Sequence, residues 1–460
     1  MRQRVTFFQN PGSPVDPASL SITKQTLNGP EIHGIREDRA TFALDELPGE
    51  LRALLERYET LQIRWASKEN HESLSSTALP ASLGSHASSF QFYQPLSNLS
   101  HFVDYAKSEL CAKADSLCPS LVENLDQASS LDISFDAAQH VFRATATWAR
   151  KTLPLSVTAV PGHRTEVGIL AADSPPNMDP SELGIAGHLT VLGQDSKPSA
   201  TIFAFPSRHR HVEGASFSSR FTKPTGLHPT LQLRIDGPTQ PPVSDADCSM
   251  HAYFTLPRAI FADRYQLSDP LFMASKNLTS LQYMSEPVDL EAPEYAVKLW
   301  GSAMLLELAP PVGKTAKSWT AEIPLHLRYL SPAQGGYADA ELPYPAVFWA
   351  CAAAPEGPDF ANNPFDRTHL GYDALFDART VFWHVDPEPT AASAASGTGH
   401  DPVSKIRVPV LDTDKAGWVN TGTAAVIALG FGWILWRLIA VYLRAGYGTA
   451  RGADKAKKLQ

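Results

Sequence analysis

The chain has 460 residues, with 48 aspartates and glutamates against 39 lysines and arginines. This mildly acidic balance argues against a nucleic-acid-binding protein, which would show clustered basic residues. The chain is longer than a domain with a single hydrophobic core usually is, so two domains are expected. The 37 prolines are scattered without a repeat, and scattered prolines interrupt helices and favour short strands and turns.

The N-terminal part of the chain is predicted to be rich in β-strands. Residues 1–66 contain strand-like runs and one amphipathic helical segment. Pro48 lies at the start of this segment, where proline is favoured in a helix. From Leu131 onward, strand-like runs follow one another between short turns, a pattern typical of a sandwich or barrel. We therefore expect a first domain over residues 1–206.

Residues 207–226 lack periodicity and are expected to link two domains. They include a basic run, Arg208-His209-Arg210-His211. Such a run could bind a metal or an anion, but two histidines at i and i+2 without a carboxylate partner are more often solvated. The expectation is a solvated linker without a metal.

A second β-rich domain is predicted over residues 227–386. Its strand-like runs are apolar on both faces over short lengths, as in strands packed between sheets. Residues 387–417 begin with a low-complexity segment of Pro, Ala, Ser and Gly, and they are predicted to form a flexible stalk.

Catalytic motifs are weak in this sequence. The D-x-D spacing, which holds a metal and sugar-nucleotide phosphates in many glycosyltransferases, occurs only in predicted loops, without a nucleotide-binding scaffold around it. An acid/base pair also needs a nucleophile or a third group, and none is identifiable. We therefore favour a protein that is not an enzyme and needs no cofactor. The candidate pairs are Asp245 with Asp247, Asp412 with Asp414, and Asp366 with His369.

The segment Trp418 to Leu443 is predicted to be a transmembrane helix. A bilayer core requires about 20 apolar residues in a helix, because unsatisfied backbone groups are too costly in lipid. No charged residue occurs between Ala424 and Trp436, and Arg437 lies near enough to the C-terminal end to extend outward.

The charges that flank this segment predict its direction. The positive-inside rule places the flank richer in Lys and Arg, here residues 444–460, in the cytosol. Asp412 and Asp414 outweigh Lys415 on the other flank. We therefore expect a mainly β protein with two β-sandwich-like lumenal domains, a flexible stalk, one C-terminal transmembrane helix over 418–443 and a basic cytosolic tail. The basic residues after the helix are Arg444, Arg451, Lys455, Lys457 and Lys458.

Two N-glycosylation sequons, at Asn98 and Asn277, agree with a lumenal body. The N-terminus does not, because its apolar stretch, Val5 to Phe8, is shorter than the 7–15 residues or so of a cleavable signal. A tail-anchored cytosolic adaptor therefore stays open as an alternative.

Four cysteines are present, and they show neither CxxC spacing nor a zinc-binding array. Cys248 opens one strand-like run and Cys351 closes another, so they could form a disulfide across one domain. Two buried free thiols are an equally good interpretation of the same pattern. The other two cysteines are Cys111 and Cys118.

Ordered blocks in the second domain resemble the PIG-X family. The first covers residues 248–267, the second residues 288–295, and the third residues 323–329, followed by Gly335-Gly336 and Leu342-Pro343. In the N-terminal part, DRATFALDELPGELR and LQIRWAS also resemble the filamentous-fungal members, which are relatives of the yeast protease-B-nonderepressible protein. The resemblance thus spans nearly the whole chain.

The resemblance implies a non-catalytic accessory subunit of mannosyltransferase I in glycosylphosphatidylinositol (GPI) anchor synthesis. That complex lies in the endoplasmic reticulum membrane and adds the first mannose to the glucosamine-phosphatidylinositol precursor. The catalytic partner is a multi-spanning protein that uses dolichol-phosphate-mannose, and this family stabilises it. Fungal members are also linked to the folding of other proteins of that lumen. A glycan-modifying enzyme remains a weaker alternative.

The resemblance also has consequences for individual residues. In the oxidising lumen, Cys248 and Cys351 are predicted to form a disulfide. Cys111 and Cys118 are a candidate second bridge. The central family signature is expected to matter for partner abundance. Its residues are Asp289, Leu290, Glu291, Ala292, Pro293, Glu294 and Tyr295.

Overall fold

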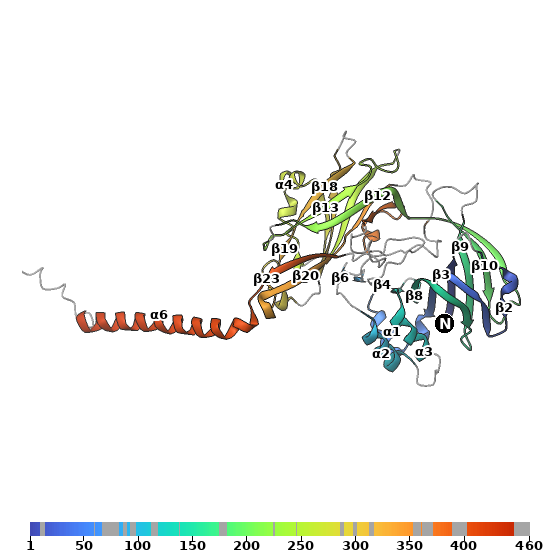
Figure 1. The fold of residues 1–460 in the computed structure, drawn as a ribbon, viewed down its shortest axis with the longest axis horizontal. Coiled ribbons are helices and arrows are strands. Elements are labelled where there is room, and N and C mark those ends of the chain that lie inside the picture. The colour runs from blue at the N-terminus through green and yellow to red at the C-terminus, as the bar shows by residue number, and fades with distance from the viewer. Residues whose placement is uncertain are drawn as a thin grey trace, which may run out of the picture. The chain divides into compact units, whose positions relative to one another are not determined.

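The structure is a computed structural model of the chain, and it is mainly β, as predicted (Figure 1). Contacts divide it into two compact units, one of Met1–Tyr329 with Ala340–Ile406 and one of Leu330–Asp339 with Arg407–Gln460. The described residues are 1–9, 14–58, 60–66, 82–85, 90–92, 98–111, 118–137, 139–173, 182–223, 226–244, 246–285, 289–297, 301–311, 317–352, 360, 371–388 and 403–445.

The N-terminal part forms an 11-stranded sheet in the order β11-β10-β9-β1-β3-β8-β7-β4-β5-β6, with β2 on β3. β1 pairs with β9 in parallel and with β3 in antiparallel orientation. The strands are β1 (Arg2–Gln9), β2 (Ser21–Ile22), β3 (Thr26–Ala43), β4 (Thr60–Ala66), β5 (Ser82–Ser85), β6 (Phe90–Phe92), β7 (Ser130–Asp136), β8 (Val141–Thr158), β9 (Arg164–Ala172), β10 (Glu182–Val191) and β11 (Ser199–Pro206).

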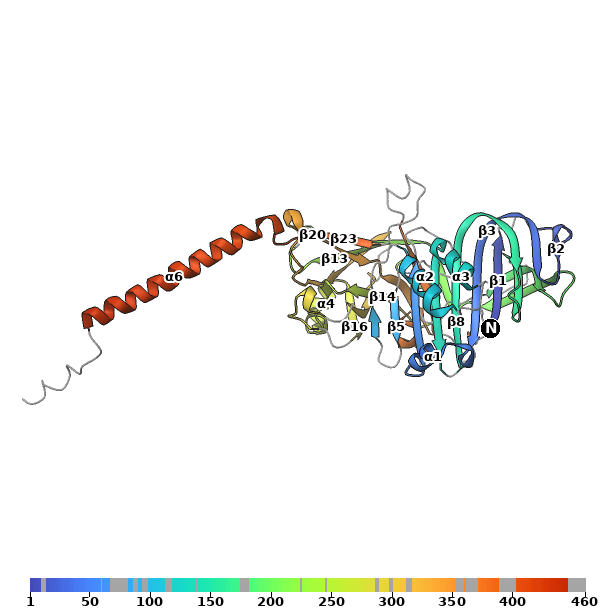
Figure 2. The same ribbon diagram turned by 90° about the horizontal axis from the view of Figure 1, so that it is seen from below.

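Short helices cover part of this sheet, and Figure 2 shows α2 and α3 beside β8. Val103 of α2 packs into a core with Trp65, Leu131 and Ala146, which come from β4, β7 and β8. These strands alternate apolar and polar residues, so one face can be covered by the helices. The helices are α1 (Gly49–Leu55), α2 (Ser100–Tyr105) and α3 (Cys118–Glu123).

The second sheet has eight strands in the order β16-β17-β14-β21-β22-β12-β13-β18. β21 is buried at every residue, because it lies in the middle of the sheet between β14 and β22 and its sequence, AVFWAC, is apolar. The strands are β12 (His209–Phe221), β13 (Thr230–Asp236), β14 (Cys248–Pro257), β16 (Leu278–Met284), β17 (Gly301–Leu308), β18 (Ser318–Pro324), β21 (Ala346–Cys351) and β22 (Val381–Pro387).

The edges of the second sheet approach each other. Glu322 of β18 donates its backbone N–H to the carbonyl of Lys276, which lies just before β16, at 3.0 Å. The two side chains also form an ion pair at 2.5 Å. The sheet therefore curls so that the segment just before β16 reaches β18 at the opposite edge, which covers part of an edge that would otherwise be exposed.

Smaller elements complete the part of the chain before the last helix. β15 (Ile260–Phe261) pairs with β19 (His326–Leu327), and β20 (Tyr337–Pro343) pairs with β23 (Val403–Pro409). The short helix α4 (Pro270–Ser275) precedes β16.

Two sequence predictions need correction. Residues 207–226 do not form a linker, because His209–Phe221 is β12, an inner strand of the second sheet. The predicted stalk is also ordered in part, since Val403–Pro409 is β23. In both segments, partner strands far away in the sequence supply hydrogen bonds that local composition does not indicate. The remaining domain boundaries stay predictions.

The last helix, α6, runs from Ala416 to Ala445 and contains the predicted segment 418–443. Figure 1 shows it as one continuous helix. Within the described part of the chain, it is the one helix long and apolar enough to cross a membrane. Its apolar side chains are exposed, as expected for a helix whose solvent is lipid.

Candidate functional site

The family-signature segment, Asp289 to Tyr295, is a turn with a fixed backbone. The carboxylate of Asp289 accepts hydrogen bonds from the backbone N–H groups of Glu291 and Ala292, both at 2.9 Å. These two bonds hold the pKa of the Asp289 carboxyl below its usual range, because they favour the charged form. The side chain of Asp289 thus fixes the backbone turn at the start of the signature.

Arg328 holds this turn in place. It is 5% exposed, its Nη1 donates to the carbonyl of Ala292 at 2.7 Å, and its guanidinium lies 4.4 Å from the centre of the Phe261 ring. Burying a guanidinium is tolerated when it is hydrogen-bonded and stacked. Arg328 therefore fixes the signature turn to β15.

A second anchor holds the end of the signature. Arg258 pairs with Glu294, with its Nε donating to the carboxylate at 2.5 Å. The backbone N–H of Glu294 donates to the carbonyl of Tyr329 at 2.9 Å. The carbonyl of Ala292 and the carboxylate of Glu294 are therefore held by these two arginines, whereas the side chains of Leu290 and Tyr295 are exposed.

The first two residues of the basic run, Arg208 and His209, are buried, contrary to the prediction of a solvated run, whereas His211 is exposed. Arg208 is buried and donates to the carbonyl oxygens of Thr380 and Asp377, both at 3.0 Å. His209 is buried as well. Local sequence does not indicate this burial, because the partners lie about 170 positions away.

His209 belongs to a buried polar cluster, which we call the histidine cluster: His209, Tyr372, Asp373 and His384. The Nδ1 of His209 lies 3.1 Å from Nε2 of His384, and its Nε2 lies 2.9 Å from Oδ1 of Asp373. The hydroxyl of Tyr372 lies 3.2 Å from the same nitrogen of His384. These side chains are of the kinds that transfer protons in acid/base catalysis.

The histidine cluster is closed to solvent. All its members are at most 5% exposed, and the rings of Phe348 and Phe382 pack on it. Burial holds the pKa of the His384 imidazole well below its usual value, and His209 and His211 lower it further. A substrate could reach these groups only after local unfolding, so the cluster supports the fold.

The remaining sequence candidates that the structure describes lie at turns or on the surface. Asp412 caps the turn before α6, accepting from the backbone N–H of Asp414 at 3.0 Å, and it pairs with Lys415 at 3.5 Å. Asp247 is exposed. The other members of the candidate pairs, Asp245, Asp366 and His369, lie outside the described residues.

Both sequon asparagines are exposed. Asn98 accepts hydrogen bonds from the backbone N–H and the hydroxyl of Ser100, at 3.3 and 2.7 Å. Asn277 has a positive φ of 57° and donates its side-chain amide to the carbonyl of Thr320 at 2.8 Å. Asparagine tolerates this backbone conformation better than most residues, so Asn277 also has a structural role.

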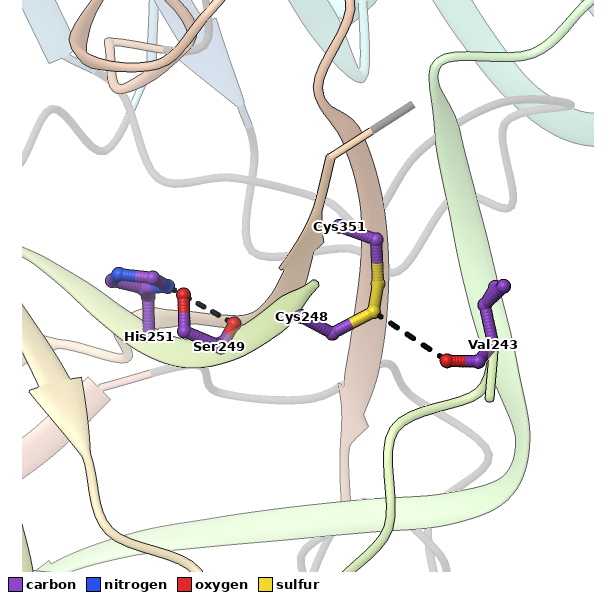
Figure 3. Close-up of a disulfide and its surroundings, with 5 residues drawn as sticks. All are labelled: Val243, Cys248, Ser249, His251 and Cys351. Carbon is purple, nitrogen blue, oxygen red and sulfur yellow. Dashed lines mark hydrogen bonds between the residues drawn. A yellow bond between two sulfur atoms is a disulfide. The ribbon is translucent and has the colours of Figure 1, made fainter. Parts of the chain in front are cut away.

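Cys248 and Cys351 face each other on neighbouring strands, β14 and β21, and a disulfide joins them (Figure 3). The Cys248 sulfur lies 3.8 Å from the carbonyl of Val243. Nearby, His251 donates from Nδ1 to the carbonyl of Ser249 at 3.1 Å. The Cys118 side chain lies outside the described residues, so the second bridge stays a prediction.

Comparison with known proteins gives one family model and several fungal relatives, including two that match over the full length of the chain. The family model described as PIG-X / PBN1 matches residues 224–439. The protein pbn1 of Neurospora crassa is 50% identical over 511 residues, and the match covers 100% of both chains. The protein PBN1 of Gibberella zeae is 43% identical over 502 residues, covering 100% of this chain and 99% of that relative. The protein PBN1 of Yarrowia lipolytica is 31% identical over 408 residues, covering 81% of this chain and 74% of that relative.

Proposed function

This chain belongs to the PIG-X/PBN1 family of accessory subunits in GPI-anchor biosynthesis, and from that premise we propose that it stabilises the catalytic subunit of GPI mannosyltransferase I. It acts in the endoplasmic reticulum membrane without catalytic residues of its own and without a cofactor. The match to family members along the whole chain is the observation that carries this proposal.

The structure is suited to this division of labour. Lipid-linked donor and acceptor require a site that several membrane helices build near the bilayer, and α6 is a single helix. A β-rich body attached to one helix can instead bind a neighbour. Binding to the folded form raises the folded population of that neighbour by mass action, by about 2.7 kcal/mol when the concentration is 100 times Kd.

We place the body in the lumen and the tail after Ala445 in the cytosol, on the basis of the flanking charges. Glycosidase treatment of the protein should give a gel shift, and changing both sequons should abolish it. Asn98→Gln removes the first sequon. Thr279→Ala is preferable for the second, because Asn277 itself is needed at its positive φ. In sealed microsomes, protease protection of the tail but not of the body would contradict this topology.

The direct test is to remove the chain from cells and to measure two quantities together. The amount of the catalytic subunit should fall, whereas mannose transfer per remaining catalytic subunit should stay unchanged. Replacing Asp245, Asp247, Asp412 and Asp414 with Asn should leave both near wild type. Normal subunit abundance with lost transfer in that variant would overturn the assignment.

A further inference from the structure

Large apolar side chains are exposed around β15 and β19. Their exposure ranges from 39% at Leu290 to 84% at Leu271. A concentration of exposed apolar side chains marks an interaction surface more often than scattered single ones do. We call this set the apolar turn surface, and its members are Leu227, Tyr265, Leu271, Leu290, Tyr295 and Tyr329.

Hydrogen bonds tie these residues to one short segment, 326–329. Leu227 and Tyr329 accept through their carbonyls from Leu327 and Glu294, at 2.8 and 2.9 Å. Gln266, next to Tyr265, contacts His326 Nε2 at 3.2 Å. Arg328 holds the carbonyl of Ala292, two residues after Leu290. Leu271 is in α4, which packs against the turn that contains Gln266.

An aspartate fixes each of three turns that carry these side chains. Asp263 accepts from the N–H of Tyr265 at 2.8 Å, and Asp269 accepts from the N–H of Leu271 at 2.9 Å. Asp289 closes the turn that carries Leu290. Since the turns are ordered beforehand, little conformational entropy is lost when a partner binds to them.

Carboxylates surround the apolar side chains. Among the described residues of these turns, three carboxylates, those of Glu291 and of the capping Asp269 and Asp289, are exposed, against one exposed basic residue, Arg264. Arg258 is paired with Glu294, and Arg328 is buried. A lipid surface presents phosphates, which exposed carboxylates repel. A peptide segment with apolar and basic side chains complements both the apolar turns and the acidic rim.

We propose that the apolar turn surface is where this chain contacts its membrane partner, through a lumenal segment that combines apolar with lysine or arginine side chains. This inference rests on the proposed function, and it identifies the contact surface. Tyrosine and arginine dominate such interfaces, and the exposed Tyr265, Tyr295 and Tyr329 supply the rigid aromatic part.

Photo-crosslinking in membranes tests which molecule binds to the apolar turn surface. A photoreactive amino acid replaces Tyr295 in the full chain, and the same amino acid at Ile202, an exposed apolar residue of β11, is the control. The expected result is a crosslink to the catalytic mannosyltransferase subunit from position 295 and none from position 202. A crosslink from position 295 to lipid, or to a second copy of this chain, would overturn the proposal.

Affinity capture through the cytosolic tail tests how much the apolar turn surface contributes to binding of the catalytic subunit. The variant Leu271→Ser/Leu290→Ser/Tyr295→Ser should capture at least tenfold less catalytic subunit, at an unchanged level of the chain itself. The matched control, Leu54→Ser/Ile202→Ser, alters exposed apolar residues of the first sheet domain and should capture as wild type does. If wild type captures no catalytic subunit, the proposed function is wrong. If wild type and the triple variant capture equally, the surface is wrong and the function stands.

Discussion

The histidine cluster and the apolar turn surface lie in the same β-rich domain and have opposite designs. In the histidine cluster, side chains suited to proton transfer are buried and contact one another. In the apolar turn surface, hydrogen bonds from Asp289 and Arg328 to the backbone fix the turns, and the apolar side chains are exposed. Accessibility, and not residue chemistry alone, therefore separates a binding site from a structural core.

Two histidine–aspartate contacts, one buried and one exposed, should show the largest difference in their contribution to stability. His209–Asp373 is buried and His211–Asp386 is about half exposed, yet both distances are 2.9 Å. Asp373→Ala should lower the free energy of unfolding by about 3–5 kcal/mol, because it leaves Arg208 and His209 without this charge partner inside the protein. Asp386→Ala should cost less than about 1 kcal/mol. Urea unfolding monitored by proteolysis would measure both, and equal losses would contradict the burial argument.

The disulfide belongs to the same buried domain core. Cys248→Ser/Cys351→Ser should lower the free energy of unfolding by about 2–5 kcal/mol, since the bridge closes a long loop in the unfolded chain. Reduction of the wild-type protein should reproduce this loss and should not affect the variant further. Non-reducing peptide mapping provides the direct check, and recovery of both cysteines as free thiols would refute the pairing.

Stability should also depend on pH through His384. Its pKa is lowered in the folded state, so the unfolded chain binds more protons once the pH falls below about 6.5. The contribution of His384 to stability is therefore fully present above that pH and is lost as the pH falls. Thermal unfolding at pH 7.5 and 5.5 should show a smaller difference for His384→Gln than for wild type. His33→Gln, at an exposed position of β3 in the other sheet, should retain the wild-type dependence.

The sequence predicted the overall class well, because apolar periodicity and the long uncharged segment reflect local chemistry. It placed the C-terminal helix within two residues at each end, Ala416–Ala445 against 418–443. It failed at β12, because that run of Arg and His gains its strand partners, β22 and β13, only through the tertiary fold.

The candidate site, too, could be predicted from the sequence only in part. The signature at Asp289–Tyr295 could be found by resemblance to the family, but sequence alone could not say which of its side chains face outward. That depends on Arg258 and Arg328, distant residues that bind the carboxylate of Glu294 and the carbonyl of Ala292. The histidine cluster was missed, since Tyr372, Asp373 and His384 have no spacing relationship to His209.

Charge reversal on the turn surface should have the smallest effect on the fold. Glu291→Lys should change the free energy of unfolding by less than about 0.5 kcal/mol, because the residue is exposed. It should nevertheless reduce capture of the catalytic subunit severalfold at low salt, and less at high salt because the interaction is screened. Glu213→Lys, an exposed position of β12, is the control. An equal reduction in the control would point to net charge and not to this surface.

The most direct test uses cells whose only copy of the chain is the Leu271→Ser/Leu290→Ser/Tyr295→Ser variant. The amount of catalytic subunit and the mannose transferred per catalytic subunit are measured in the same membranes. A stabiliser that acts through the apolar turn surface predicts a large drop in the first quantity and no change in the second. Normal subunit abundance with transfer abolished would contradict the account.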